Sequence, residues 1–188
     1  AVALFIATIS GGIAVAPSTD VGTAATDVHA RAVSAEPIRA VYLSSGIAAG
    51  KSFDTFLHLL DTTEINALVI DLKDANGRIA FPTTNTALRS FTPARPTIPD
   101  LADRVRRIHE HHGYAIARLP VFQDTWHAER RTSEALKRPD GSLWRDGIGG
   151  AWCDPASPVV WDYTIAIARD AAAIGFDEIN FDYMRFPS

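Results

Sequence analysis

Charged and phenolic side chains recur on one face of four expected strands, near the point where each strand ends. They are Tyr42, Asp71, Lys73, Arg118 and Asp182. Sites of α/β proteins form at the carboxyl ends of parallel strands, so this placement predicts a functional site. A lone buried carboxylate is costly, and Asp71 and Asp182 therefore need Lys73 and Arg118 as partners. The alternative is an ion-pair cluster that only fills the interior, but polar groups from several strands at one end favour a site.

The expectation that these side chains share a face rests on strand periodicity, because successive strand residues point to opposite faces. The stretch ALVIDLK (67–73) places Leu68, Ile70 and Leu72 on one face and Val69, Asp71 and Lys73 on the other. The stretch EINFDYMRF (178–186) places Tyr183 on the apolar face and Asp182 on the opposite one. Helices should cover the apolar faces of a parallel sheet, which leaves the polar faces toward a barrel interior or a sheet crevice.

The elements that position these residues alternate between strand and helix patterns. Strands are predicted at 38–45, 67–73, 114–122 and 178–186, and helices at 53–63, 101–112 and 158–174. The pair Asn76-Gly77 predicts a type I′ hairpin turn after the second strand. This alternation predicts an α/β fold with a parallel sheet and right-handed crossovers. A doubly wound sheet and a (β/α)8 barrel share the pattern, but no dinucleotide or P-loop glycine spacing follows the first strand.

Composition and charge restrict the class of protein. The chain has 188 residues with 22 acidic and 18 basic side chains, and its formal charge of −4 gives no electrostatic reason to expect a nucleic acid partner. A single cysteine, Cys153, excludes an internal disulfide. His109, His111 and His112 suit the end of a helix through its dipole, and no carboxylate or cysteine completes a zinc set with them. Neither a metal nor another cofactor is therefore expected.

The N-terminal region differs from the rest of the chain. Residues 1–17 carry no charge and are mostly small or branched apolar, which predicts the remnant of an export signal or a membrane anchor. Residues 18–36 lack an apolar period and predict a flexible linker. The folded domain is expected at 37–188. With either origin of the first segment, the protein is expected to be secreted or associated with the cell envelope.

Several segments resemble a bacterial glycoside hydrolase-like family with a (β/α)8 barrel. These are VYLSSG, NALVIDLKDANGRIAF, RPDGSLWRD and the block from AWCDPASP to FDEINFDYMRFPS. The final block is the most specific, and the resemblance extends from about Ile38 to Ser188. It implies a TIM-type barrel, which needs roughly 250 residues. Residues 37–188 are therefore expected to be a truncated N-terminal half of that barrel, with four parallel strands and crossover helices.

The resemblance also implies hydrolysis of glycosidic bonds, which uses two carboxyl groups, one as acid and one as nucleophile or base. Asp182 matches the strand position at which amylase-like barrels carry their nucleophile, and Arg118 or Arg185 would keep it ionised. The partner acid is expected from a later strand. Asp71 is the alternative acid on an interior-facing position of this chain.

Substrate contacts are expected from polar side chains and from loop tryptophans. The polar contacts are assigned to Tyr42, Lys73, Arg118 and Arg185. Sugar rings present apolar faces that stack on indole, so Trp126 and Trp152 are expected to form subsites. Trp144 and Trp161 are instead expected to pack within the fold.

Two functions remain open from the sequence. The first is a retaining glycoside hydrolase that acts on an extracellular or cell-envelope polysaccharide or oligosaccharide, with the 188-residue chain itself inactive because the second carboxyl group is missing. The second is a non-catalytic barrel that binds carbohydrate or has a structural role in the envelope. A carboxylate at the end of a later strand would favour the enzyme.

Overall fold

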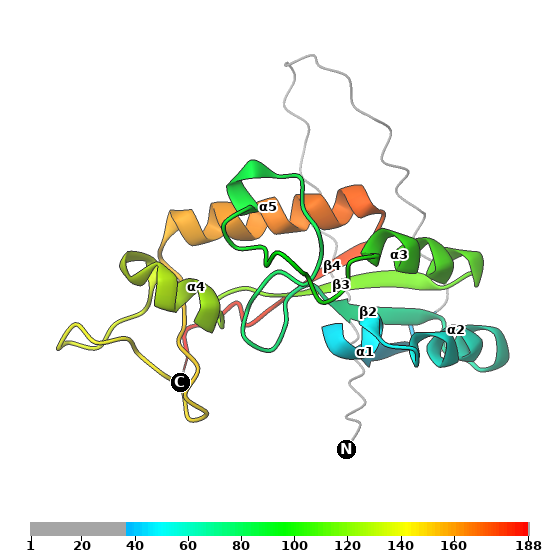
Figure 1. The fold of residues 1–188 in the computed structure, drawn as a ribbon. Helices are drawn as coiled ribbons and strands as arrows, with labels where there is room; N and C mark the ends of the chain where they lie inside the picture. Colours follow the sequence, from blue (N-terminus) through cyan, green and yellow to red (C-terminus); the bar gives the residue numbers. More distant parts are fainter. Residues whose placement is uncertain (1–36, 188) are drawn as a thin grey trace, which may run out of the picture.

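The computed structural model describes residues 37–187, which form a four-stranded parallel sheet with helices between the strands (Figure 1). The strands are β1 (Ala40–Leu43), β2 (Ala67–Asp71), β3 (Tyr114–Pro120) and β4 (Glu178–Asp182). They pair in the order β1-β2-β3-β4, as predicted. The signal or anchor segment expected at 1–17 and the linker expected at 18–36 lie outside the described residues.

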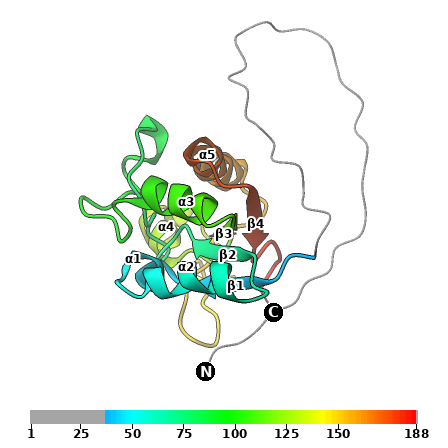
Figure 2. The ribbon, with the colours of Figure 1, turned by 90° about the vertical axis from the view of Figure 1, so that its right-hand side faces the viewer.

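Helices α2, α3 and α5 provide the crossovers between successive strands. The helices of the structure are α1 (Ser45–Ala49), α2 (Phe53–Thr62), α3 (Leu101–Glu110), α4 (Thr125–Arg130) and α5 (Pro158–Ile174), with 3-10 turns η1 (Thr86–Leu88) and η2 (Thr132–Glu134). Helices α2, α3 and α5 gather on one side of the curved sheet (Figure 2). Within residues 37–187, no helix has the length and apolar character needed to cross a membrane.

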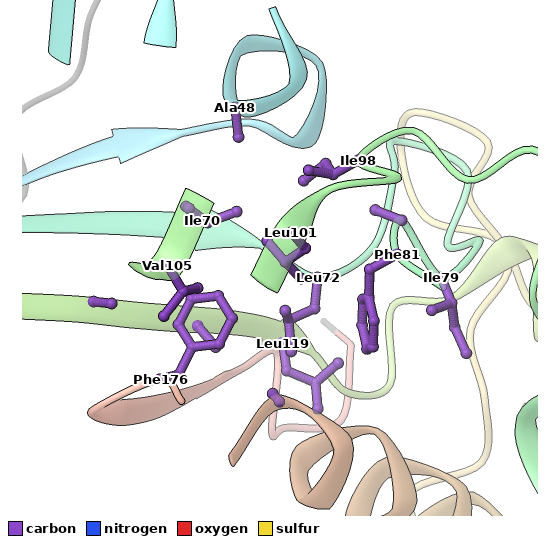
Figure 3. Close-up of a cluster of buried hydrophobic side chains, with 14 of the residues drawn as sticks. Ala48, Ile70, Leu72, Ile79, Phe81, Ile98, Leu101, Val105, Leu119 and Phe176 are labelled. Atoms are coloured by element: carbon purple, nitrogen blue, oxygen red, sulfur yellow. The ribbon is translucent and has the colours of Figure 1, made fainter. Parts of the chain in front are cut away.

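The hydrophobic core lies between the sheet and these helices (Figure 3). Alternate strand residues enter it, because the pleat turns every second side chain toward the helices. Ile70 of β2 and Leu119 of β3 are fully buried there, against Leu101 and Val105 of α3. The opposite face of the sheet therefore receives Asp71, Arg118 and their neighbours.

Each strand ends earlier than its apolar pattern suggested. Strand β1 stops at Leu43 because the Ser44 hydroxyl accepts a hydrogen bond from the Ile47 amide and starts α1, a helix that the sequence did not predict. Strand β4 stops at Asp182 because Tyr183 adopts a left-handed backbone conformation with φ of 55°. The prediction that β4 runs to residue 186 is therefore wrong, and the alternation of faces ends at Asp182.

The excursion between β3 and α5 lies beyond the carboxyl ends of the strands, at the left of Figure 1. It contains α4, which the sequence did not predict, and short antiparallel bridges such as Lys137 with Leu143. A second hydrophobic cluster supports it, formed by Val121, Phe122, Ala128, Ala135, Ala151, Trp152, Cys153 and Val160. The excursion is therefore a packed layer above the sheet rather than a loose loop.

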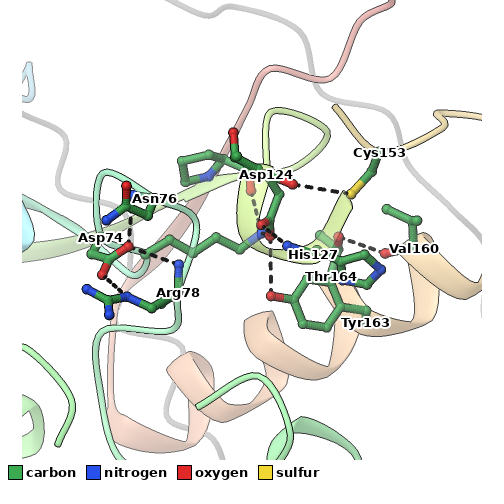
Figure 4. Close-up of polar contacts among 12 residues, drawn as sticks. Asp74, Asn76, Arg78, Asp124, His127, Cys153, Val160, Tyr163 and Thr164 are labelled. Atoms are coloured by element: carbon green, nitrogen blue, oxygen red, sulfur yellow. Dashed lines mark hydrogen bonds and ion pairs between the residues drawn. The ribbon is translucent and has the colours of Figure 1, made fainter. Parts of the chain in front are cut away.

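A buried ion pair joins this layer to the sheet. The Lys73 ammonium, just beyond β2, donates to the Asp124 carboxylate at 2.7 Å and to the Pro120 carbonyl at 2.9 Å. Asp124 also accepts from the Tyr163 hydroxyl of α5 and from the His127 amide, so it caps α4 (Figure 4). Both side chains of the pair are fully buried. Removing one partner of such a pair leaves an uncompensated charge, at a cost of about 3–5 kcal/mol.

The turn after β2 is shaped to approach Asp124. The Asp74 carboxylate accepts hydrogen bonds from the amides of Asn76 and Arg78, and Gly77 has φ of 91°. Asn76 has no positive φ, so the turn at Asn76-Gly77 is not the predicted type I′. A Cβ atom at Gly77 would overlap with the Asp124 carboxylate, with its Cγ only 2.9 Å away.

Gly77→Ala is expected to destabilise the protein by about 2–4 kcal/mol, because strain at positive φ combines with displacement of a buried carboxylate. Gly141→Ala is the matched control, since Gly141 has φ of 84° and nothing within 4 Å of the added Cβ. Its cost should be only about 1 kcal/mol. Urea unfolding of both variants measures the difference. Equal losses of stability would contradict the role given to close packing against Asp124.

Candidate active site

Arg118 joins two carboxylates on the face of the sheet that carries no crossover helix. Its Nη1 donates to Asp71 Oδ1 at 2.6 Å. Its Nε and Nη2 donate to Asp182 Oδ2 at 2.9 and 2.6 Å. The guanidinium therefore holds the last residue of β2 and the last residue of β4 together. The alternation of side chains between the two faces of each strand predicted this arrangement.

Strand register explains this arrangement. Asp71 and Arg118 are direct partners across β2 and β3, so their side chains rise from the same level of the sheet. Asn180 is the partner of Arg118 on β4, and Asp182 lies two residues further on the same face. The forked guanidinium spans that step, because separate nitrogens donate to Asp71 and Asp182.

Tyr42 completes the network from β1. Its hydroxyl donates a hydrogen bond to Asp71 Oδ2, while the ring lies 5.5 Å from the guanidinium carbon of Arg118. Burial, the hydrogen bond to Asp71 and the charge of Asp71 together raise the pKa of Tyr42 to about 12. Asp71 thus accepts from two donors, one on each of its oxygens.

The two carboxylates of the network stabilise the protonated form of Arg118. Burial opposes the charged guanidinium, but hydrogen bonds and attraction from Asp71 and Asp182 outweigh it and raise the pKa of Arg118 above its ordinary value. The Asp182 side chain remains 42% exposed, against 11% for Asp71. Asp182 is therefore the carboxylate of the pair that a ligand can reach.

Tyr183 belongs to this site, although strand parity assigned it to the helix-covered face. Its amide donates to Asp182 Oδ1 at 2.7 Å, and its ring lies 5.7 Å from the Arg118 guanidinium carbon. The left-handed backbone at Tyr183 reverses the expected direction of the side chain. Non-glycine residues rarely adopt this conformation, and such strain clusters at functional sites.

A pocket of about 210 Å³ adjoins Tyr183. It is lined by Gln123, Trp144, Asp146, Gly147, Ile148, Trp152, Tyr183, Arg185 and Pro187. The Arg185 guanidinium carbon lies 5.7 Å from the Trp152 ring centroid and 6.0 Å from that of Tyr183. The structure therefore places the predicted contacts Arg185 and Trp152 in a pocket next to the Asp71–Arg118–Asp182 network.

Trp152 does not present an indole face for stacking. It is only 2% exposed, its Nε1 donates to Asp146, and its ring packs edge-on against Trp144 and Tyr183. Trp144, which was expected only to pack, is the more exposed of the two tryptophans and lines the same pocket. The burial of Trp152 therefore argues against the stacking role predicted for it.

Lys73 does not enter the site, contrary to expectation. Strand β2 ends at Asp71, and the chain then turns into the hairpin, so the alternation of faces no longer applies at residue 73. The ammonium is bound to Asp124 and lies 4.9 Å from the Tyr163 ring centroid, with no exposed side-chain surface. Lys73 is thus a structural residue and partners neither Asp71 nor Asp182.

Trp126 is also separated from the network. It lies on α4, where its ring contacts the guanidinium groups of Arg78 and Arg130. It does not line the pocket beside Tyr183. The subsite expected at Trp126 stays a prediction.

Other groups with potential chemistry have structural surroundings. Cys153 is fully buried, and burial raises the pKa of its thiol well above the ordinary value. His109 contacts Asp177, and His111 contacts Asp61. Residues 37–187 contain no group of three or more His, Cys, Asp or Glu side chains arranged to hold a metal ion.

Sequence reasoning missed Asp146 and Gln123 as parts of the pocket. Asp146 starts the segment DGIGG, in which glycines and an aspartate indicate a tight turn, and this signal could have drawn attention to it. Gln123 carries no such signal, because only the tertiary fold brings it within 3.0 Å of Asp146.

A family described as "Putative glycosyl hydrolase domain" matches residues 40–188. The chain belongs to this family, which implies a carbohydrate substrate. No curated protein matches the chain significantly.

Solved structures support the same fold. A hypothetical protein from Ruminiclostridium thermocellum is 31% identical with a TM-score of 0.71, over 78% of this chain and 77% of that chain. An α-L-fucosidase from Paenibacillus thiaminolyticus has 18% identity and a TM-score of 0.59, over 76% of this chain and 23% of that one. A maltogenic α-amylase from Thermotoga neapolitana has 15% identity and a TM-score of 0.56, over 80% and 40%. The fold is the N-terminal half of a (β/α)8 barrel.

Tyr42 is expected to ionise about two pH units above an ordinary tyrosine, because its phenol is partly buried and bound to Asp71. The difference in phenolate absorbance between the wild type and Tyr42→Phe should show one group titrating near pH 12. Its neutral form stabilises the folded state below pH 10, and this contribution is lost as pH rises through about 12. Asp71→Asn should move the titration toward pH 10, whereas an unchanged titration would contradict the assigned cause.

Proposed function

We propose that this domain belongs to a retaining glycoside hydrolase that acts on an extracellular or cell-envelope polysaccharide, with Asp182 as the nucleophile. The observation that carries the proposal is the state of Asp182. Its side chain is partly exposed at the carboxyl end of β4 and is held by Arg118 and by the Tyr183 amide. Family membership supplies the reaction class.

The contacts of Asp182 suit a carboxylate nucleophile. Arg118 and the Tyr183 amide both donate hydrogen bonds to the Asp182 carboxyl group. They also fix the plane of the carboxyl group, and attack on an anomeric carbon needs such a fixed approach. Oxygen Oδ1 keeps a lone pair beyond its single backbone hydrogen bond.

Asp71 serves as a positioning residue in this mechanism. It accepts from the Tyr42 hydroxyl and from Arg118, and it holds the guanidinium against Asp182. Both oxygens of Asp71 are thus already engaged by donors of the network. The proton donor is instead supplied by a residue outside 37–187, and the half-barrel alone does not turn over substrate. Retention requires that this acid lie about 5–5.5 Å from Asp182.

Location outside the cytoplasm is part of the proposal. The uncharged apolar stretch at 1–17 supports export, by a cleaved signal or by a retained membrane anchor. Envelope and extracellular polysaccharides are the glycans available there.

A non-catalytic carbohydrate-binding barrel is the second candidate. It is favoured by the ion-pair network itself, because Arg118 engages both carboxylates and could have a purely structural role. The two candidates differ in whether Asp182 is needed for bond cleavage or only for packing.

Asp182→Asn in the full-length protein is expected to reduce hydrolysis of an active glycan by at least ~10³-fold, because an amide cannot form the glycosyl-enzyme intermediate. A panel of envelope and extracellular polysaccharides identifies the active glycan through released reducing ends. Asp162→Asn is the matched control, since Asp162 is exposed on α5. Proton NMR of the first product should show a retained anomeric configuration.

Turnover by Asp182→Asn equal to that of Asp162→Asn would remove Asp182 from the mechanism. Glycan binding without turnover by the wild type would favour the binding barrel. Comparable unfolding midpoints of the two variants must accompany either result.

A further inference from the structure

The pocket beside Asp182 contains one cation that has no carboxylate partner among residues 37–187. This residue is Arg185, whose side chain is exposed. The other arginine of the site, Arg118, is engaged by both Asp71 and Asp182. The donors of Arg185 are therefore available to a ligand.

The carboxylate of the pocket is occupied by protein donors. Asp146 Oδ1 accepts from the amides of Ile148 at 3.1 Å and Gly150 at 2.8 Å. Asp146 Oδ2 accepts from Gln123 Nε2 at 3.0 Å and Trp152 Nε1 at 2.9 Å. Burial opposes its charge, but these hydrogen bonds outweigh burial and lower the pKa of Asp146. Asp146 shapes the pocket and leaves little acceptor capacity for a ligand or for Arg185.

Arg185 is oriented by the aromatic side chains next to it. Its guanidinium carbon lies near the ring centroids of Trp152 and Tyr183, at 5.7 and 6.0 Å. Such contacts limit the motion of the guanidinium and leave its N–H edge free. A planar fork of donors matches the two oxygens of a carboxylate.

The size and walls of the pocket suit one sugar ring. Its volume of about 210 Å³ is below the roughly 300–1,000 Å³ of sites for drug-sized ligands. Trp144 and Ile148 offer apolar surface to a ring, while Arg185 offers the charge. Asp182, the residue before Tyr183, is already ion-paired with Arg118.

We infer that this pocket binds a sugar unit with an anionic group, the carboxylate of a uronic acid or a sulfate ester, through Arg185. The inference rests on the proposed function, because the bound unit belongs to the polysaccharide that Asp182 attacks. It adds the substrate class, an acidic glycan, to that function. The neighbouring ring of Tyr183 then separates the charge-binding group from the reacting carboxylate.

Binding of monosaccharides to the full-length protein tests the inference, with ligand-observed NMR as the measurement. Glucuronic acid should bind about tenfold more tightly than glucose, as expected for one charge-assisted contact in a partly exposed pocket. Glucose 6-sulfate distinguishes the two anionic groups. Binding of glucuronic acid alone assigns a carboxylate, and binding of both acidic sugars assigns a site for anions in general.

Arg185→Gln should abolish the preference for glucuronic acid over glucose. Arg138→Gln is the matched control, since Arg138 is an exposed arginine of the excursion that does not line the pocket. Arg185→Lys keeps the charge without the planar fork and should retain only part of the preference. A wild type that prefers neither glucuronic acid nor glucose 6-sulfate over glucose, or an unchanged preference in Arg185→Gln, would overturn the inference.

Asp182→Asn separates this inference from the proposed function. The variant should still prefer glucuronic acid, because Asp182 is not a wall of the pocket. If it also hydrolyses glycan normally, the proposed function fails while the binding site stands. If it loses hydrolysis and the wild type shows no preference for acidic sugars, only the inference fails.

Discussion

One guanidinium between two carboxylates is the interaction on which the open face of the sheet depends. Asp71 and Asp182 rise from strands separated by β3, and two like charges on one face of a sheet repel unless a cation lies between them. Arg118 occupies the intervening strand and binds both. The same contact that satisfies the charges also sets the direction of Asp182, so the requirements of the fold and of the site coincide at this residue.

The layer beyond the strand ends depends on a separate charge pair. Asp124 binds Lys73 of the β2 hairpin, the amide of His127 at the start of α4 and the hydroxyl of Tyr163 in α5. This buried carboxylate therefore connects the three elements. This pair is closed to solvent, whereas the Arg118 network is open on the side of Asp182. Two groups of similar chemistry therefore have different roles, and their exposure distinguishes them.

The sequence predicted the directions of site residues inside the strands but not of those just past the strand ends. Parity placed Asp71, Arg118 and Asp182 correctly, because the pleat of a buried parallel strand leaves only two faces. The same rule misplaced Lys73 and Tyr183, which lie just past the ends of β2 and β4. A hairpin and one left-handed residue, neither visible in apolar periodicity, decide the direction of those side chains.

Partners that lie far apart in the chain could not be predicted from the sequence, for a different reason. Asp124 is 51 residues from Lys73, and only packing of the excursion brings them together. The family resemblance supplied the half-barrel and the reaction class, and the structural neighbours agree with that fold. It did not supply the pocket, because the walls come from a turn in the excursion and from residues beyond β4.

The hydrogen bonds of Asp146 make the turn at 146–150 a unit with its own internal support. Its amides and the indole of Trp152 satisfy the carboxylate locally, so the turn's shape does not rely on Arg118 or on Asp182. The wall of the pocket that this turn forms and the ion pairs of Arg118 therefore depend on separate stretches of the chain. In evolutionary terms, the turn can diverge, lengthen or be exchanged between relatives while the strand-borne charges stay unchanged.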